Sequence, residues 1–124
     1  VLARRPGQVT PGASPVRSLA QTGRLQRPEA LRVEGAQIER LRRRRGDEPE
    51  MHYPADARSQ GIDGMVLVDL LITPEGYVQE AQVVTESPAD AGFGLAALDV
   101  VKTWEFDNEF KRLVLMTVSV LFLP

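Results

Sequence analysis

The chain has 124 residues, a formal net charge of −2 at pH 7 and no cysteine. This length suits one small domain with an additional segment, and the lack of cysteine excludes a disulfide framework and a thiolate metal site. The longest apolar run, 11 residues over 113–123, is shorter than the roughly 20 residues that a membrane-spanning helix needs.

Charge and aromatic side chains divide the chain near residue 50. Residues 1–50 contain 11 Arg, no Lys and 6 acidic residues, whereas residues 51–124 contain 4 basic and 11 acidic residues. The two parts therefore have net charges of +5 and −7, and all 7 aromatic residues lie in the second part. The pattern predicts a basic arm, residues 1–50, joined to an acidic folded domain, residues 51–124.

The arm itself has two parts. Proline and glycine interrupt residues 1–27, and no apolar periodicity survives between them, which is typical of a flexible linker. Residues 28–45 contain good helix formers. Pro28 suits the start of a helix and Gly46 its end, so a helix is predicted over 28–45.

Four arginines, Arg42–Arg45, end this predicted helix. Such a run can neutralise phosphates and bind nucleic acid without regard to sequence, or it can be a solvated helix end. No aromatic residue interleaves with the arginines, and the adjoining domain is acidic. The solvated helix end is favoured, and no nucleic-acid partner is predicted.

Two strands joined by a tight turn are predicted early in the domain. Alternate residues of Gly64–Ile72 are Val, Leu or Ile, which predicts a strand, and Thr73–Gly76 has the proline and glycine of a type I turn. In the second strand, the step from Val78 to Ala81 is odd where strict alternation needs an even number. The step indicates a bulge at residues 79–80.

A helix and a last strand complete the predicted domain. The stretch Gly92–Phe106 contains the only tryptophan and apolar residues at helical spacing, which predicts a helix from Phe93 to Thr103 or Trp104. Because a two-stranded hairpin is marginal in water, this helix is expected to cover its apolar face. The last strand is predicted within Leu113–Leu123. The predicted core residues are Val66, Val68, Phe93, Ala97, Val101, Trp104 and Phe106.

In this order, the segments resemble the C-terminal domain of the TonB family of energy transducers, over residues 52–124. Two details depart from the family pattern: the loop 107–112 lacks the usual proline and glycine, and Glu86 stands where a serine is usual. The resemblance rests on Tyr53-Pro54, Gly61–Gly64, Thr73–Gly76, the Val78/Ala81/Val83 strand up to Ser87, Ala96–Leu98, Val101, and Trp104-x-Phe106 before a final strand.

The resemblance implies an α+β fold: a three-stranded antiparallel sheet with two helices packed on one face, as a β-β-α-β core preceded by a short helix. It also implies a periplasmic domain, tethered to the inner membrane in the full-length protein, with residues 1–50 as the end of the tether. The family passes energy from a proton-driven inner-membrane complex of ExbB and ExbD to outer-membrane transporters. An adaptor domain of a trans-envelope motility or secretion machine, which binds a scaffold protein, is the alternative.

A terminal strand at a sheet edge offers unpaired N–H and C=O groups to an extended partner segment. We expect Leu113–Leu121 to be such an edge, and the resemblance adds Tyr53-Pro54 as a second contact. The alternatives are that the strand pairs with its own copy in a symmetric homodimer, or that the arm covers part of it. The predicted partner-binding residues are Tyr53, Pro54, Arg112, Leu113, Leu115, Thr117, Ser119 and Leu121.

An enzyme is not predicted. The only histidine, His52, has no second histidine or cysteine with which to share a metal, and the motifs GxSxG, HExxH and GxxxxGK[ST] are absent from the sequence. The carboxylates of Asp69, Glu75, Glu80 and Glu86 are distributed along strands and a turn, as on solvated faces. We therefore predict no catalytic residue, no cofactor and no metal.

Overall fold

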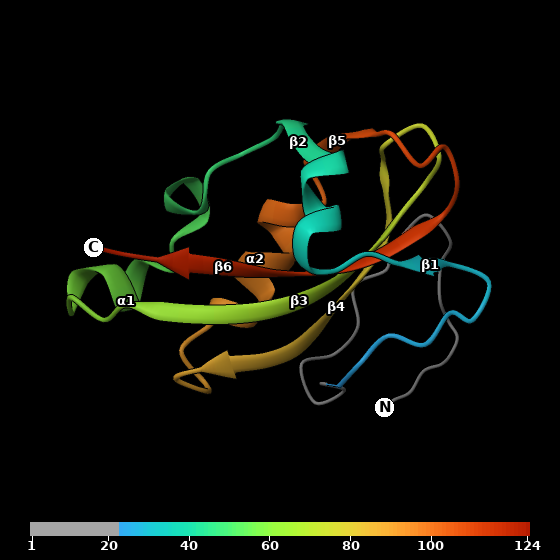
Figure 1. Cartoon of the computed structure of the whole chain (residues 1–124). Helices are drawn as coiled ribbons and strands as arrows, with labels where there is room; N and C mark the ends of the chain where they lie inside the picture. The colour runs from blue at the N-terminus through green and yellow to red at the C-terminus, as the bar shows by residue number, and fades with distance from the viewer. Residues whose placement is uncertain (1–22) are drawn as a thin grey trace.

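Residues 23–124 are described by the computed structural model, in which a four-stranded sheet forms the centre (Figure 1). β3 pairs antiparallel with both β4 and β6, whereas β1 lies parallel to the start of β6. The predicted α+β class is confirmed, and the short β1 adds a fourth strand to the three that were expected. In the order β1-β6-β3-β4, the strands are β1 (Leu31–Arg32), β6 (Val114–Phe122), β3 (Gly64–Ile72) and β4 (Val78–Ser87).

Helices and a small ribbon surround this sheet. Helix α2 packs against β4 and β3, and the buried Ala57 of α1 belongs to the same core. Among the helices of residues 23–124, none has the length and apolarity that crossing a membrane requires. These elements are η2 (Gly35–Arg40) and η3 (Pro49–His52), both 3-10 helices, α1 (Ala55–Ser59), α2 (Phe93–Val101), and the antiparallel strands β2 (Leu41–Arg45) and β5 (Glu105–Asn108).

The predicted bulge in the second strand is confirmed. Two successive residues of β3, Leu71 and Ile72, pair with Glu80 and Val78, so Gln79 is the extra residue. The turn that joins the two strands closes with a hydrogen bond of 2.9 Å from its last N–H to its first carbonyl, over the four residues that the sequence indicates.

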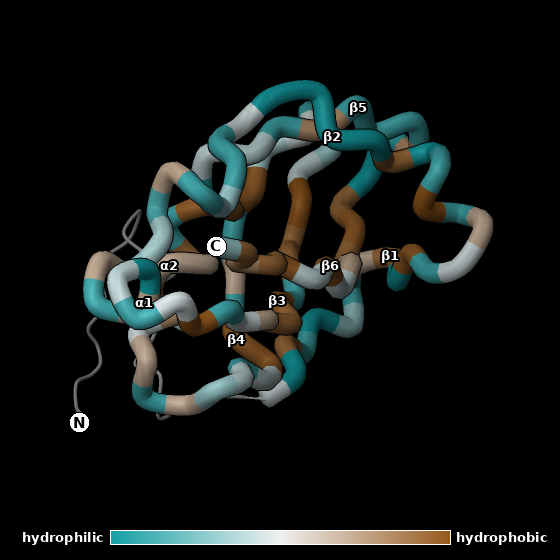
Figure 2. Tube along the Cα trace, turned by 90° about the vertical axis from the view of Figure 1, so that its left-hand side faces the viewer, coloured by the Kyte–Doolittle hydropathy of each residue, from teal (hydrophilic) through white to brown (hydrophobic). Residues whose placement is uncertain are grey.

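The core lies between the sheet and α2. The rings of Tyr53, Phe93 and Phe122 pack together with centroids 5.1–5.8 Å apart. Figure 2 shows apolar residues along β3 and β6 and hydrophilic residues over β2. Trp104 is half-buried and packs against this core from its rim. The other residues expected in the core are buried: Val66, Val68, Phe93, Ala97, Val101 and Phe106.

The predicted helix over residues 28–45 is wrong. The chain there forms β1, η2 and β2 in succession. Val33 and Leu41 are each 1% exposed because both side chains enter the core of the domain. A solvated helix would forgo this burial, and tertiary packing routinely overrides helix propensity. Arg42–Arg45 therefore lies on strand β2 and is not a helix end.

The second face of the sheet is partly covered by residues 23–30, which we call the covering segment. Its Leu25 is 6% exposed and packs against Leu71 and Leu115. Of the predicted linker, residues 1–27, the part up to residue 22 lies outside the described residues. Residues 23–27, by contrast, lie against the sheet.

Candidate functional site

Strand β6 is paired along its length on one side only. Toward β3 it forms nine consecutive residue pairs, whereas β1 pairs only with Val114 and Leu115 on the other side. There, the carbonyls of Leu113 and Leu115 accept hydrogen bonds of 3.0 and 2.9 Å from the N–H groups of Leu31 and Val33. The first part of the predicted edge is therefore already occupied by the chain's own N-terminal region.

The rest of this edge is open. Backbone groups of alternate residues in a strand point to the same side, so those of Thr117, Ser119 and Leu121 point away from β3, as those of Leu113 and Leu115 do. Within residues 23–124, no backbone group of another segment pairs with these three residues. The open edge thus has N–H and C=O groups of three residues available for an additional strand.

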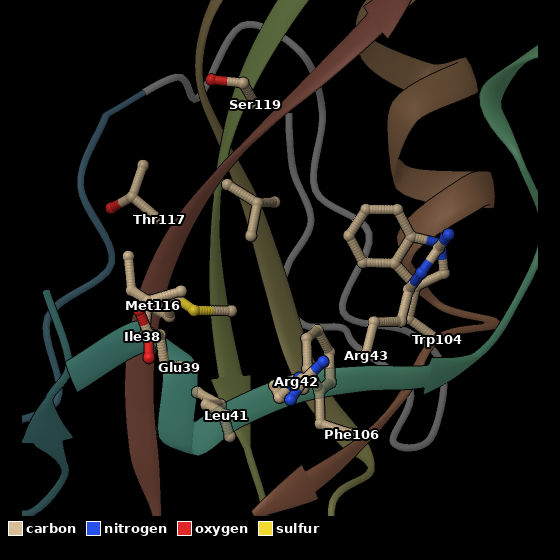
Figure 3. Close-up of a pocket in the computed structure, with 11 residues that line it drawn as sticks. Ile38, Glu39, Leu41, Arg42, Arg43, Trp104, Phe106, Met116, Thr117 and Ser119 are labelled. Atoms are coloured by element: carbon tan, nitrogen blue, oxygen red, sulfur yellow. The ribbon is translucent and has the colours of Figure 1, made fainter. Parts of the chain in front are cut away.

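A groove of about 800 Å³ lies beside the open edge. Figure 3 shows Trp104 and Arg43 on one side of it and Ile38 and Met116 on the other. A strand added to β6 would direct every second side chain into this groove, because side chains alternate between the two faces of a sheet. We call it the edge groove; its lining residues are Ile38, Glu39, Leu41, Arg42, Arg43, Trp104, Phe106, Met116, Thr117, Val118 and Ser119.

Trp104 is held in place in the wall of the edge groove. Its indole Nε1 donates a hydrogen bond of 2.9 Å to the Asp47 carbonyl, and the guanidinium of Arg43 lies 4.6 Å from the centre of its ring. Gly46 has φ of +137°, and a Cβ atom there would lie 2.8 Å from the Trp104 Cα. Only glycine permits this close approach, so the loop after β2 fixes the position of the tryptophan.

The arginine run on β2 is largely neutralised by acidic residues. Arg44 pairs with Asp107 at 3.0 Å and with Glu105 at 3.3 Å, and the hydrogen bond to Glu105 is the main reason that the pKa of Arg44 is raised above its ordinary value. Arg43 pairs with Glu48 at 2.7 Å. These pairs leave little free positive charge for a nucleic-acid backbone.

The expected partner-binding residues lie in three different surroundings. Thr117 and Ser119 line the edge groove, and Leu121, 49% exposed, follows them along the open edge. Leu113 and Leu115 lie where β1 is paired, and Arg112 is exposed in the loop before β6. Tyr53 is 9% exposed and donates a hydrogen bond to the Ile62 carbonyl, so it supports the end of β6 from within the core, next to the half-buried Pro54.

Sequence reasoning missed the wall of the edge groove that β2 and η2 form. The sequence predicts Ile38, Leu41 and Arg42 in a helix of the arm, and Trp104 only in the core. The alternation of apolar and polar residues from Leu31 to Val33 was the available signal for a strand, but it is too short to outweigh the helix formers around it. His52 contacts Asp47 at 2.8 Å, and residues 23–124 contain no group of three His, Cys, Asp or Glu side chains arranged to hold a metal.

A family model described as "Gram-negative bacterial TonB protein C-terminal" matches residues 49–122, which is more than half of the chain. The chain belongs to the TonB C-terminal family. The solution NMR structure of the Pseudomonas aeruginosa TonB CTD is similar to it, with a TM-score of 0.58 and 23% sequence identity, over 75% of this chain and 92% of that chain. At this identity the likeness shows the fold alone. No curated protein matches the sequence.

Domains of the TonB C-terminal family are periplasmic in Gram-negative bacteria. The family match covers η3, α1, β3, β4, α2, β5 and β6. It begins after β1, η2 and β2, so one wall of the edge groove is built by residues outside the family match.

Proposed function

We propose that this TonB-like domain is a non-enzymatic interaction domain that docks an extended segment of an outer-membrane partner as an additional strand on β6. The open edge at Thr117, Ser119 and Leu121 is the observation that supports the proposal most directly. Backbone pairing supplies affinity for many sequences, and pockets for alternate side chains supply selectivity. The edge groove provides such a pocket, with Trp104, Met116 and Val118 in its lining.

In this proposal the domain also transmits force that derives from the proton-motive force. It acts together with an inner-membrane complex of the ExbB/ExbD kind. Pulling a guest strand along β6 loads several backbone hydrogen bonds at once. The nine residue pairs between β6 and β3 then pass the load to the centre of the sheet. In this proposal Tyr53 supports Phe122 at the end of the strand from within the core, and the half-buried Pro54 next to it contacts the partner.

Ser119→Pro tests the docking mode in the full chain. The backbone N–H of Ser119 faces away from β3, so proline removes a donor for the guest strand and leaves the pairing with β3 in place. We expect affinity for a peptide from the periplasmic N-terminal segment of an outer-membrane transporter to fall about tenfold. Ser119→Ala, which keeps the N–H, is the matched control and should bind within about twofold of wild type.

Equal peptide affinity of a folded Ser119→Pro variant and wild type would exclude strand addition at this edge. If wild type sediments as a dimer and the Ser119→Pro variant sediments as a monomer, a second copy of the chain occupies the edge. Capture from an outer-membrane extract then identifies the partner. A transporter supports the proposed role, whereas a scaffold protein supports an adaptor of a motility or secretion machine.

A further inference from the structure

A second cleft, separate from the edge groove, lies where the covering segment crosses the sheet toward β1. Its volume is about 370 Å³. Three arginines line it, Arg24, Arg27 and Arg32, and none of its lining residues is acidic. Leu25, Ala30 and Leu115 form the apolar part of its lining. We call it the arginine cleft.

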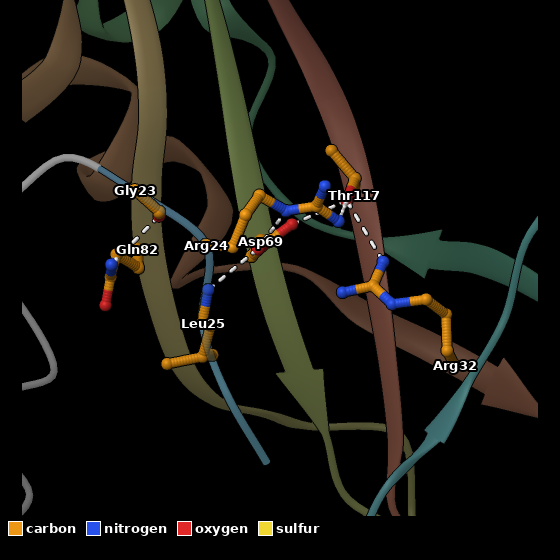
Figure 4. A network of polar contacts seen from close by, with 7 residues as sticks. All are labelled: Gly23, Arg24, Leu25, Arg32, Asp69, Gln82 and Thr117. Carbon is orange, nitrogen blue, oxygen red and sulfur yellow. Dashed lines mark hydrogen bonds and ion pairs between the residues drawn. The ribbon is translucent and has the colours of Figure 1, made fainter. Parts of the chain in front are cut away.

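Two of these guanidinium groups converge on one hydroxyl (Figure 4). Arg24 Nη2 lies 3.3 Å and Arg32 Nη1 3.5 Å from Oγ1 of Thr117. The same hydroxyl donates its proton to the carboxylate of Asp69. A threonine hydroxyl has one proton and two lone pairs, so these three hydrogen bonds use its full capacity to donate and accept. The other N–H groups of Arg32 have no acceptor among the described residues.

The charges around the arginine cleft do not balance. Arg24 is paired with Asp69 at 3.0 Å, and Arg27 with Glu80. Arg32 has no carboxylate partner among residues 23–124, although it is half-buried. Three positive and two negative charges therefore leave one positive charge in excess, at a cleft with space for a ligand.

From this we infer that the arginine cleft binds a phosphate group. Guanidinium groups favour phosphate and carboxylate because their N–H donors match the spacing of the oxygens. Arg24 and Arg32 approach from two different segments, so a tetrahedral group, with oxygens pointing in several directions, can accept from both, whereas the oxygens of a carboxylate lie in one plane. A bound phosphate would also join the covering segment to β1 and thereby strengthen the cover over the first part of β6.

Titration of the full chain with inorganic phosphate, against chloride at equal ionic strength, tests this inference. We expect saturable binding, with amide shifts in the NMR spectrum concentrated at Leu31, Arg32 and Thr117. Arg32→Gln should weaken the affinity at least about tenfold, because a charge-assisted hydrogen bond is lost. Arg58→Gln is the matched control, since Arg58 also has no ion pair among residues 23–124 and lies on α1, outside the arginine cleft and the edge groove, and it should leave the affinity unchanged.

Vesicles of phosphatidylcholine with and without phosphatidic acid identify the source of the phosphate. Sedimentation with the phosphatidic acid vesicles, lost in Arg32→Gln, assigns the site to a lipid headgroup. Saturable binding of inorganic phosphate without vesicle binding assigns it to a small phosphorylated molecule. If wild type responds to neither probe beyond the chloride control, or if Arg32→Gln binds as wild type does, the inference is overturned. The amide shifts of wild type locate the site even if the Arg32→Gln variant does not fold.

Discussion

The carboxylate of Asp69 holds the covering segment on the sheet, and its replacement should release that segment. Asp69 is 0% exposed. It accepts hydrogen bonds from Arg24 Nε at 3.0 Å, from the Leu25 N–H at 2.9 Å and from the Thr117 hydroxyl. Asp69→Asn keeps the shape of the side chain and removes its charge.

The expected cost follows from these three bonds. A hydrogen bond to a charged group contributes about 1.5–3 kcal/mol, against about 0.5–1.5 kcal/mol for a neutral one. Asn has one acceptor oxygen where Asp has two, so the Thr117 hydroxyl loses its acceptor, and the loss of charge weakens the bonds from Arg24 and Leu25 by about 1 kcal/mol each. The Arg24 side chain is 51% exposed, so water screens its part of the loss. We expect a total of about 2 kcal/mol, which corresponds to roughly a 30-fold change in an equilibrium constant.

Amide hydrogen exchange measures this change where it acts. The N–H groups of Leu31 and Val33 bond to β6, and they exchange when the covering segment and β1 detach together. In Asp69→Asn their exchange should be roughly 30-fold faster, while amides of β3 such as Val68 change far less because the central sheet stays paired. Asp99→Asn, which removes an exposed pair with Lys102 on α2, is the matched control with little expected effect. Unchanged exchange at Leu31 and Val33 in Asp69→Asn would refute the assigned role of the carboxylate.

Two further substitutions test the packing that supports β6. Gly64→Ala places a Cβ about 2.4 Å from the ring of Phe93, so overpacking should lower the free energy of unfolding by about 1–3 kcal/mol; an unshifted urea midpoint would contradict this. Asn108, 7% exposed, donates hydrogen bonds of 2.9 Å to two backbone carbonyls and accepts one from an N–H. Asn108→Ala should cost about 2–4 kcal/mol in urea unfolding, because these groups lose their partner, and a loss below about 0.5 kcal/mol would show that water replaces the side chain.

Asn108 also explains how the loop before β6 is built. The family pattern has a proline and a glycine there, and this chain has neither between Asp107 and Arg112. The side chain of Asn108 bridges the carbonyls of Thr73 and Arg112, and Lys111 takes the left-handed conformation at φ 57° that a glycine would adopt easily. A buried side-chain network thus replaces the backbone restrictions of proline and glycine.

The core of the domain follows from local patterns in the amino-acid sequence. Alternation in Gly64–Ile72, the odd step before Ala81 and the helical spacing after Gly92 are local patterns, and each gives the period of the element that buries those residues. The strands, the bulge and α2 followed from them. The order of the motifs also indicates the TonB C-terminal family.

The surroundings of β6, by contrast, depend on contacts between segments far apart in the chain. β1 pairs with residues more than 80 positions away in the chain, Leu31 with Val114, and Asp69 bonds to Leu25 across 44 positions. No local period encodes such partners, and the helix formers of residues 28–45 predicted the wrong element. Val33 and Leu41 become core residues, and Leu41 starts strand β2, because burial against the sheet outweighs a propensity difference of a few tenths of a kcal/mol per residue. Which part of β6 remains open to a partner is therefore a property of the folded chain.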